Sequence, residues 1–111
     1  EFLTGPKLTS GIIAANISDG VKSSGTYTPT PIGGNFRTLS NAGAFTLAAP
    51  VEPGVYTMLL EMTNATGAGA VTLSGFANVT GDSLTTTVGS KFQISIAKTP
   101  AGVTATVAAM Q

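Results

Sequence analysis

Short runs in which apolar and polar residues alternate are the feature that most limits how this chain can fold. The clearest run is "KFQISIAK" at 91–98, where an apolar residue occupies every second position. Side chains of a β-strand point alternately to its two faces, so this run predicts a strand with one buried face. "AFTLA" at 44–48 alternates in the same way, and "VYTMLLEM" at 55–62 has apolar residues on part of both faces, as a central strand does. Each of them therefore predicts a further strand.

Turn-forming stretches separate these runs. Glycine, proline and asparagine gather at 28–35, 49–54, 64–70 and 85–90, and fourteen glycines interrupt any helical period. Eighteen threonines favour strands, because β-branched side chains pack well on a pleated surface. Turns at intervals of about 8 to 12 residues are typical of sandwiches and barrels. We therefore expect an all-β protein, either an antiparallel β-sandwich or a jelly-roll-like barrel.

The sequence predicts structure clearly at the C-terminal end of the chain and less clearly at the N-terminal end. "TPAG" at 99–102 leads into the alternating "VTATVAAM", which predicts a hairpin of two antiparallel strands. The first 20 residues alternate weakly and are compatible with a short helix, an extended arm or a strand. We expect an arm over 1–20 and one β-sandwich domain over 21–111. Apolar residues of the arm need cover, which symmetric assemblies often supply by exchanging terminal segments. Together with a tyrosine in "GTYTPTP", they are the candidate partner contacts: Ile12, Ile13, Ile17 and Tyr27.

The residue types that are absent exclude much chemistry. The chain has no Cys and no His, so it lacks disulfides, thiolate metal sites and the commonest general base. The five basic and five acidic residues are scattered, and the longest apolar stretch is far below the roughly 20 residues of a membrane span. We expect no enzymatic activity, no cofactor, no metal, no nucleic acid and no membrane. Charged residues make up 9% of the chain against about 25% in typical proteins, which indicates a surface partly covered by partners.

Few residues could carry a reaction. Glycoside cleavage would require acids that are far apart in sequence, such as Glu52 and Glu61, to converge. Asp82 in "TGDS" is interpreted as a turn residue that accepts a backbone N–H of its own loop, followed by a short Thr-rich strand. "NIS", "NAT" and "NVT" match the glycan acceptor pattern at Asn16, Asn64 and Asn78. In so Thr-rich a chain, we interpret these matches as coincidental.

Longer stretches resemble a known family. They are "NAGAFTLAAP" at 41–50, "TMLLEMTNATGAGAVTLSGFANVTGDSLTTTVGSKFQISI" at 57–96 and the final "VAAMQ". In their order of strands and turns they are similar to a family of small β-rich structural proteins encoded by tailed bacteriophages. The likeness covers roughly residues 23–111 and includes no catalytic positions.

The resemblance implies a virion protein that binds other virion subunits. We expect a capsid decoration or cement protein, with the major capsid protein or tail proteins as partners. A homo-oligomer is expected, and a trimer would suit a place where three capsid subunits meet. The alternative is a tail fibre or tail-tip module that binds a host receptor or glycan. Exposed aromatic rings clustered at one end of the molecule would favour that alternative.

Overall fold

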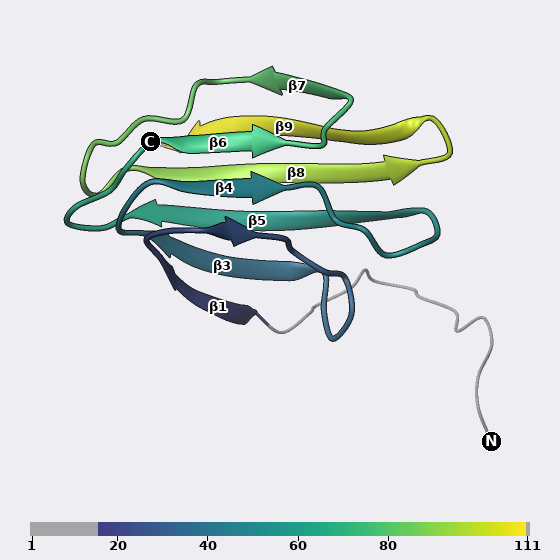
Figure 1. The fold of residues 1–111 in the computed structure, drawn as a ribbon, viewed down its shortest axis with the longest axis horizontal. Helices are drawn as coiled ribbons and strands as arrows, with labels where there is room; N and C mark the ends of the chain where they lie inside the picture. Colours follow the sequence, from purple (N-terminus) through teal and green to yellow (C-terminus); the bar gives the residue numbers. More distant parts are fainter. Residues whose placement is uncertain (1–15, 111) are drawn as a thin grey trace.

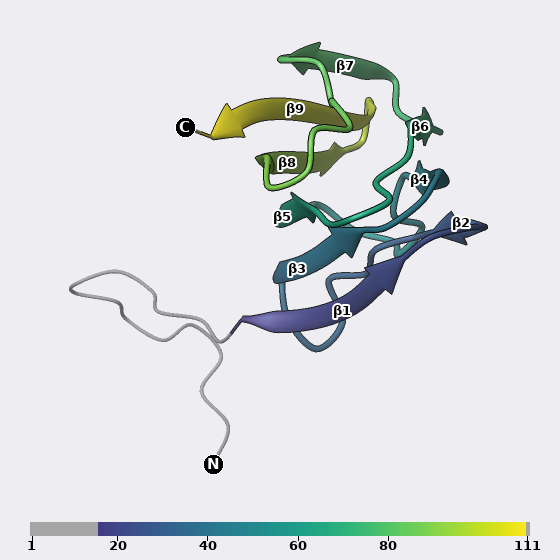
Figure 2. The same ribbon diagram turned by 90° about the vertical axis from the view of Figure 1, so that its left-hand side faces the viewer.

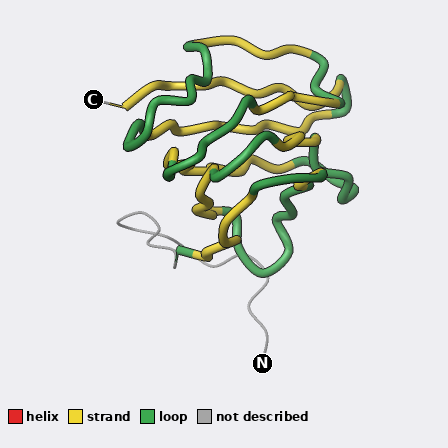
Figure 3. Tube along the Cα trace, turned by 60° about the vertical axis from the view of Figure 1, so that its left-hand side comes forward, coloured by secondary structure: helices red, strands yellow, loops and turns green. Residues whose placement is uncertain are grey.

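A computed structural model describes residues 16–110, and these residues form strands and no helix (Figures 1 and 3). The prediction of an all-β protein is confirmed, and the three alternating runs form β4, β5 and β8. The strands are β1 (Ile17–Lys22), β2 (Thr26–Tyr27), β3 (Phe36–Asn41), β4 (Phe45–Ala48), β5 (Tyr56–Asn64), β6 (Val71–Ser74), β7 (Asn78–Gly81), β8 (Lys91–Thr99) and β9 (Gly102–Met110).

The strands form two sheets that face each other across the core (Figure 2). The larger sheet has the order β1-β3-β5-β8-β9-β7, and the smaller has the order β2-β4-β6. From β1 to β6 the chain alternates between the two sheets. Each strand that it adds to a sheet therefore runs in the same direction as the strand before it in that sheet. β1, β3 and β5 are therefore parallel to one another, as are β2, β4 and β6. The chain winds as a coil in which each turn adds a strand to both sheets.

The C-terminal hairpin interrupts this coil. β8 and β9 are antiparallel and joined by a two-residue turn, with Thr99 opposite Gly102, so the predicted hairpin is confirmed. The hairpin lies between β5 and β7: β8 is antiparallel to β5, and β7 is parallel to β9. Among residues 16–110 the smaller sheet receives no further strand, and β6 lies at its margin.

The antiparallel pairing expected for a sandwich or jelly roll is wrong for most of the described chain. Five of its seven strand pairs are parallel, because the segment between two neighbouring strands crosses to the other sheet instead of reversing in the same one. The Thr-rich strand expected after Asp82 is also absent, since residues 83–90 contain no strand. The expected boundary between arm and domain, after residue 20, falls within β1.

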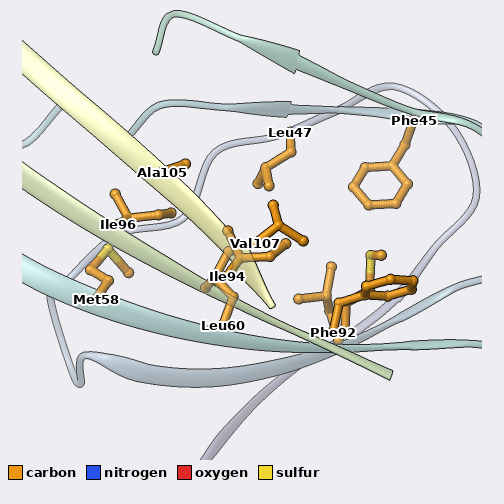
Figure 4. Close-up of a cluster of buried hydrophobic side chains, with 11 residues drawn as sticks. Phe45, Leu47, Met58, Leu60, Phe92, Ile94, Ile96, Ala105 and Val107 are labelled. Carbon is orange, nitrogen blue, oxygen red and sulfur yellow. The ribbon is translucent and has the colours of Figure 1, made fainter. Parts of the chain in front are cut away.

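The core is an apolar layer between the two sheets (Figure 4). Every second residue is buried in β4, in β5 from Met58 onward and in β8 from Phe92 to Ile96, as the alternation predicts. Burying one such side chain stabilises the fold by about 1.5 to 3 kcal/mol. The buried apolar residues are Leu39, Phe45, Leu47, Met58, Leu60, Met62, Phe92, Ile94, Ile96, Ala105 and Val107.

Two asparagines hold successive turns of the coil together where β3 and β5 end. Asn41 and Asn64 are paired in register and are 0% and 1% exposed. The Oδ1 of Asn41 accepts the N–H groups of Gly43 and Gly69, both at 3.2 Å. Its Nδ2 donates to the Gly69 carbonyl at 2.8 Å and to Asn64 Oδ1 at 3.3 Å. We call this pair the asparagine corner.

The turns at the corner are in close backbone contact. A Cβ atom on Gly69 would lie 2.1 Å from the backbone nitrogen of Ala44, which no real Cβ tolerates. Asn64 Nδ2 donates to the carbonyls of Thr85 and Thr87, at 2.7 and 3.0 Å. The corner thus also fastens the long segment between β7 and β8. Because its amide is enclosed and donating, Asn64 is not a site for a glycan.

Candidate interaction surfaces

The described residues among the predicted partner contacts face inward. Ile17 lies in β1 opposite Arg37 of β3 and is half-buried. Tyr27 lies in β2, where its hydroxyl donates to Asp19 Oδ2 and the Lys22 ammonium lies 4.6 Å from its ring centroid. The ring is therefore engaged by the protein's own groups. Ile12 and Ile13 lie outside the described residues.

Arg37 is the centre of a polar cluster that closes the β1 margin of the core. It occupies the same row across the sheet as Leu60, yet it is a charged side chain that is 8% exposed. Its Nη1 lies 2.8 Å from Asp19 Oδ1. Nη2 donates to the Ile32 carbonyl at 2.6 Å and Nε to the Gly34 carbonyl at 3.1 Å. These bonds hold the loop between β2 and β3 against the end of the core.

The tyrosine in this cluster makes stability sensitive to alkaline pH. Burial raises the pKa of Tyr27 above its ordinary value of 10.0; the hydrogen bond to Asp19 and that carboxylate's charge raise it further, while Arg37 lowers it. The native state therefore keeps a proton that the unfolded chain loses above about pH 10, so stability is full below that pH and falls as the pH rises. One such group contributes a slope of at most about 1.4 kcal/mol per pH unit.

We expect Tyr27→Phe to make the alkaline fall of stability shallower. The comparison is made by urea unfolding of both proteins between pH 8 and 11. Part of the slope should remain in the variant, because burial, followed by the charge of Glu52, also raises the pKa of Tyr56. Equal slopes for the two proteins would show that Tyr27 keeps no protected proton in the native state.

The loops that follow β2 and β4 present exposed aliphatic side chains at one end of the molecule. The two strands are parallel neighbours, so residues 28–35 and 49–55 leave the smaller sheet at the same end (Figure 1). Ile32, Val51 and Val55 are 68%, 74% and 69% exposed. We call these three residues the loop-tip end. Sequence reasoning assigned these segments to turns and missed the surface, because single aliphatic residues in turns carry no signal of their own.

The outer face of the larger sheet is rich in hydroxyl and amide groups. Thr38, Glu61 and Gln93 lie in one row across β3, β5 and β8. Beside this row is a shallow hollow of about 270 Å³, which Phe36 also lines. Phe36 is 41% exposed, whereas the other aromatic rings of the described residues are buried or half-buried. Exposed rings are thus not clustered among residues 16–110.

The acidic residues lie apart and make different structural contacts. Asp82 Oδ2 accepts the backbone N–H of Ala109 at 2.8 Å, so it fastens β9 and does not serve its own loop as predicted. The backbone carbonyl of Glu52 accepts the Tyr56 hydroxyl at 2.9 Å and the Lys98 ammonium. Over the part of the chain that the structure describes, no three acidic residues gather where they could hold a metal ion.

Comparison with known proteins gives no relative. No family model, no curated protein and no solved structure matches the chain. The described residues also include no helix that could cross a membrane.

Proposed function

We propose that this protein is a non-enzymatic structural component of a tailed-phage virion, in which it decorates or cements the capsid. The observation that carries the proposal is the loop-tip end, where three aliphatic side chains are exposed on a chain with only 9% charged residues. Exposed aliphatic side chains on two loops at the same end of the molecule suit a surface that binds another protein. Each bound copy stabilises the assembled particle by mass action.

We also propose a fold type and an oligomeric state for the protein. The coil of parallel strands favours a short two-sheet β-solenoid, in place of the antiparallel sandwich expected from the turns. A homo-oligomer agrees with the low charge, and a trimer would suit a three-fold position on a shell. The major capsid protein is the expected partner of the loop-tip end.

A tail fibre or tail-tip module is the second candidate, and one observation favours it. Phe36 is an exposed ring beside Glu61 and Gln93, and an aromatic platform next to a carboxylate and an amide suits a saccharide. Because exposed rings do not cluster among the described residues, we place the tail-fibre hypothesis second.

The first test locates the protein on the particle. Purified virions are labelled with a gold-conjugated antibody against this chain and imaged by electron microscopy. Label spread over the head is the expected result. Label confined to the tail would establish the fibre reading instead, and unlabelled particles would overturn both.

The second test addresses the loop-tip end. We expect the double variant Val51→Ser/Val55→Ser to bind shells stripped of the protein at least about tenfold more weakly, because two valines lose their burial in the contact. Cosedimentation over a range of protein concentrations measures this. The matched control is Val88→Ser, at another well-exposed valine in the segment between β7 and β8, and this variant should bind normally. Equal loss in the two variants would contradict a contact at the loop-tip end.

A further inference from the structure

β6 has one edge that pairs with no other strand of residues 16–110. Within this described part of the chain it is the last strand of the smaller sheet, with β4 as its neighbour. The carbonyls of Ala70 and Ser74 accept hydrogen bonds from the β4 segment. Backbone groups of successive residues point to opposite sides of a strand, so those of Val71 and Leu73 point to the unpaired side. Two N–H donors and two carbonyl acceptors are therefore available to another strand.

A groove lies along this edge. It has a volume of about 330 Å³ and opens between β6 and the β7–β9 pair. Its apolar lining consists of Val71, Leu73, Val79, Leu84 and Val107, and we call it the edge groove. Val71, Leu73 and Leu84 are only half-buried, so a strand placed here would complete their burial. The described residues supply no fourth strand to the smaller sheet at this place, opposite the end of the larger sheet (Figure 2).

Natural sheets protect their free edges, and β6 has fewer of the protective features than β1 and β2 have. Charged residues, prolines, bulges and very short strands are the usual devices. β1 carries Asp19 and Lys22 and an irregular register between Ser18 and Val21. β2 has two residues and is soon followed by Pro29. The four-residue "VTLS" of β6 is short, but it carries no charge, no proline and no bulge, so it remains open to an added strand.

We propose that the edge groove binds the N-terminal segment of a second copy, residues 1–15, as an extended strand added to β6. This segment joins the fold at β1, which is the margin of the coil opposite to β6. When copies stack head to tail, the β1 margin of one copy faces the edge groove of the next. The sequence from Leu8 to Ser18 has no charge and supplies the pair Ile12 and Ile13 for the groove.

The contact joins two different surfaces, so it repeats from copy to copy and closes into a ring or continues as a row. This inference rests on the proposed function, because a contact between copies would hold neighbouring subunits together on a capsid shell. Its test uses the isolated protein and does not depend on where the protein lies on a virion. Failure of one proposal is therefore distinguishable from failure of the other.

Single cysteines test the contact, since the natural chain has none. A full-length chain with Ile13→Cys is mixed with a chain with Val79→Cys, and a short bis-maleimide joins cysteines that lie close together. Val79 is exposed and lines the edge groove. We expect a mixed dimer on denaturing gels, with about tenfold lower yield when Val55→Cys of the loop-tip end replaces Val79→Cys as the matched control.

Two outcomes would overturn the proposal. One is a mixed-dimer yield no higher than that of the Val55→Cys control. The other is a double variant, Ile13→Cys/Val79→Cys, that links only within one chain, because the segment would then cover its own molecule.

Light scattering gives an independent measurement. Val79→Lys places a charge in the groove at an exposed position, and we expect the oligomer to become monomeric. Val88→Lys, at an exposed valine outside the groove and the loop-tip end, should leave the mass unchanged. An oligomer that persists in Val79→Lys would exclude the edge groove as the contact.

Discussion

Asn41→Ala is expected to lower the free energy of unfolding by about 4 kcal/mol. Asn41 uses its whole amide at the asparagine corner: it accepts from Gly43 and Gly69 and donates to Gly69 and Asn64. The substitution removes a partner from three backbone groups and from Asn64 Oδ1, and each buried polar group left unpaired costs about 1 to 3 kcal/mol. A domain of this size has about 5 to 15 kcal/mol of stability in total. Urea unfolding followed by circular dichroism measures the loss.

The matched control for this prediction is Asn78→Ala. Asn78 is an exposed residue of β7, so the same chemical change should cost less than about 0.5 kcal/mol. Asn41→Asp is a second test, since it keeps the shape and the accepting oxygen but loses the donor. Its carboxylate would face the Gly69 carbonyl and Asn64 Oδ1, so the variant should be least stable at neutral pH and partly recover when the group is protonated in acid. Equal costs for Asn41→Ala and Asn78→Ala would mean that the corner does not hold the coil.

The strands could be predicted from the sequence because burial in a sheet has a period of two. Phe45, Leu60 and Phe92 lie at alternating apolar positions, and all three are buried. The hairpin could also be predicted from the sequence, since its turn is short and local. The pairing of the other strands could not be predicted in this way. A turn such as 49–54 has the same composition whether the chain reverses within a sheet or crosses to the opposite one.

A repeat in the sequence was the signal that could have revealed the coil. "NAGAFTLA" at 41–48 and "NATGAGAVTLS" at 64–74 share an asparagine, a small-residue turn and a strand with the order apolar, Thr, Leu. In the structure these stretches are successive turns of the coil: Asn41 is paired with Asn64, and Leu47 with Leu73. Repeats at a spacing of 20 to 50 residues are typical of solenoids. The insertion within the second turn makes this repeat harder to recognise.

The candidate surfaces followed less well from the sequence. Tyr27 was selected as an aromatic ring among turn residues, but its hydroxyl bonds to Asp19 across the polar cluster. That contact depends on the register of β1 and β2, which no local pattern encodes. The loop-tip end arises because the coil brings two separate turns to the same end, and the edge groove arises because the hairpin displaces β7 from the neighbourhood of β5.

Arg37→Met is expected to cost about 3 to 5 kcal/mol of stability, the usual cost of removing one partner of a buried ion pair. The variant leaves the Asp19 carboxylate enclosed without its charge partner and frees the carbonyls of Ile32 and Gly34. Because these groups lie at the β1 margin, the first consequence is local opening of β1 and the loop over residues 28–35. Hydrogen exchange measured by mass spectrometry should show faster exchange there, while β5 and β8 keep more of their protection.

A second substitution separates the ion pair from simple loss of packing. In Arg37→Met/Asp19→Asn the enclosed charge is removed as well, so the double variant should be more stable than Arg37→Met alone, as a coupling between the two residues requires. Lys91→Met is the matched control for loss of a long cation, since Lys91 is exposed and its ammonium contacts the Thr63 hydroxyl at 3.0 Å. It should cost less than about 0.5 kcal/mol. Strictly additive losses in the double variant would show that Asp19 gains nothing from Arg37, and the closed margin of the core would then depend on the loop carbonyls alone.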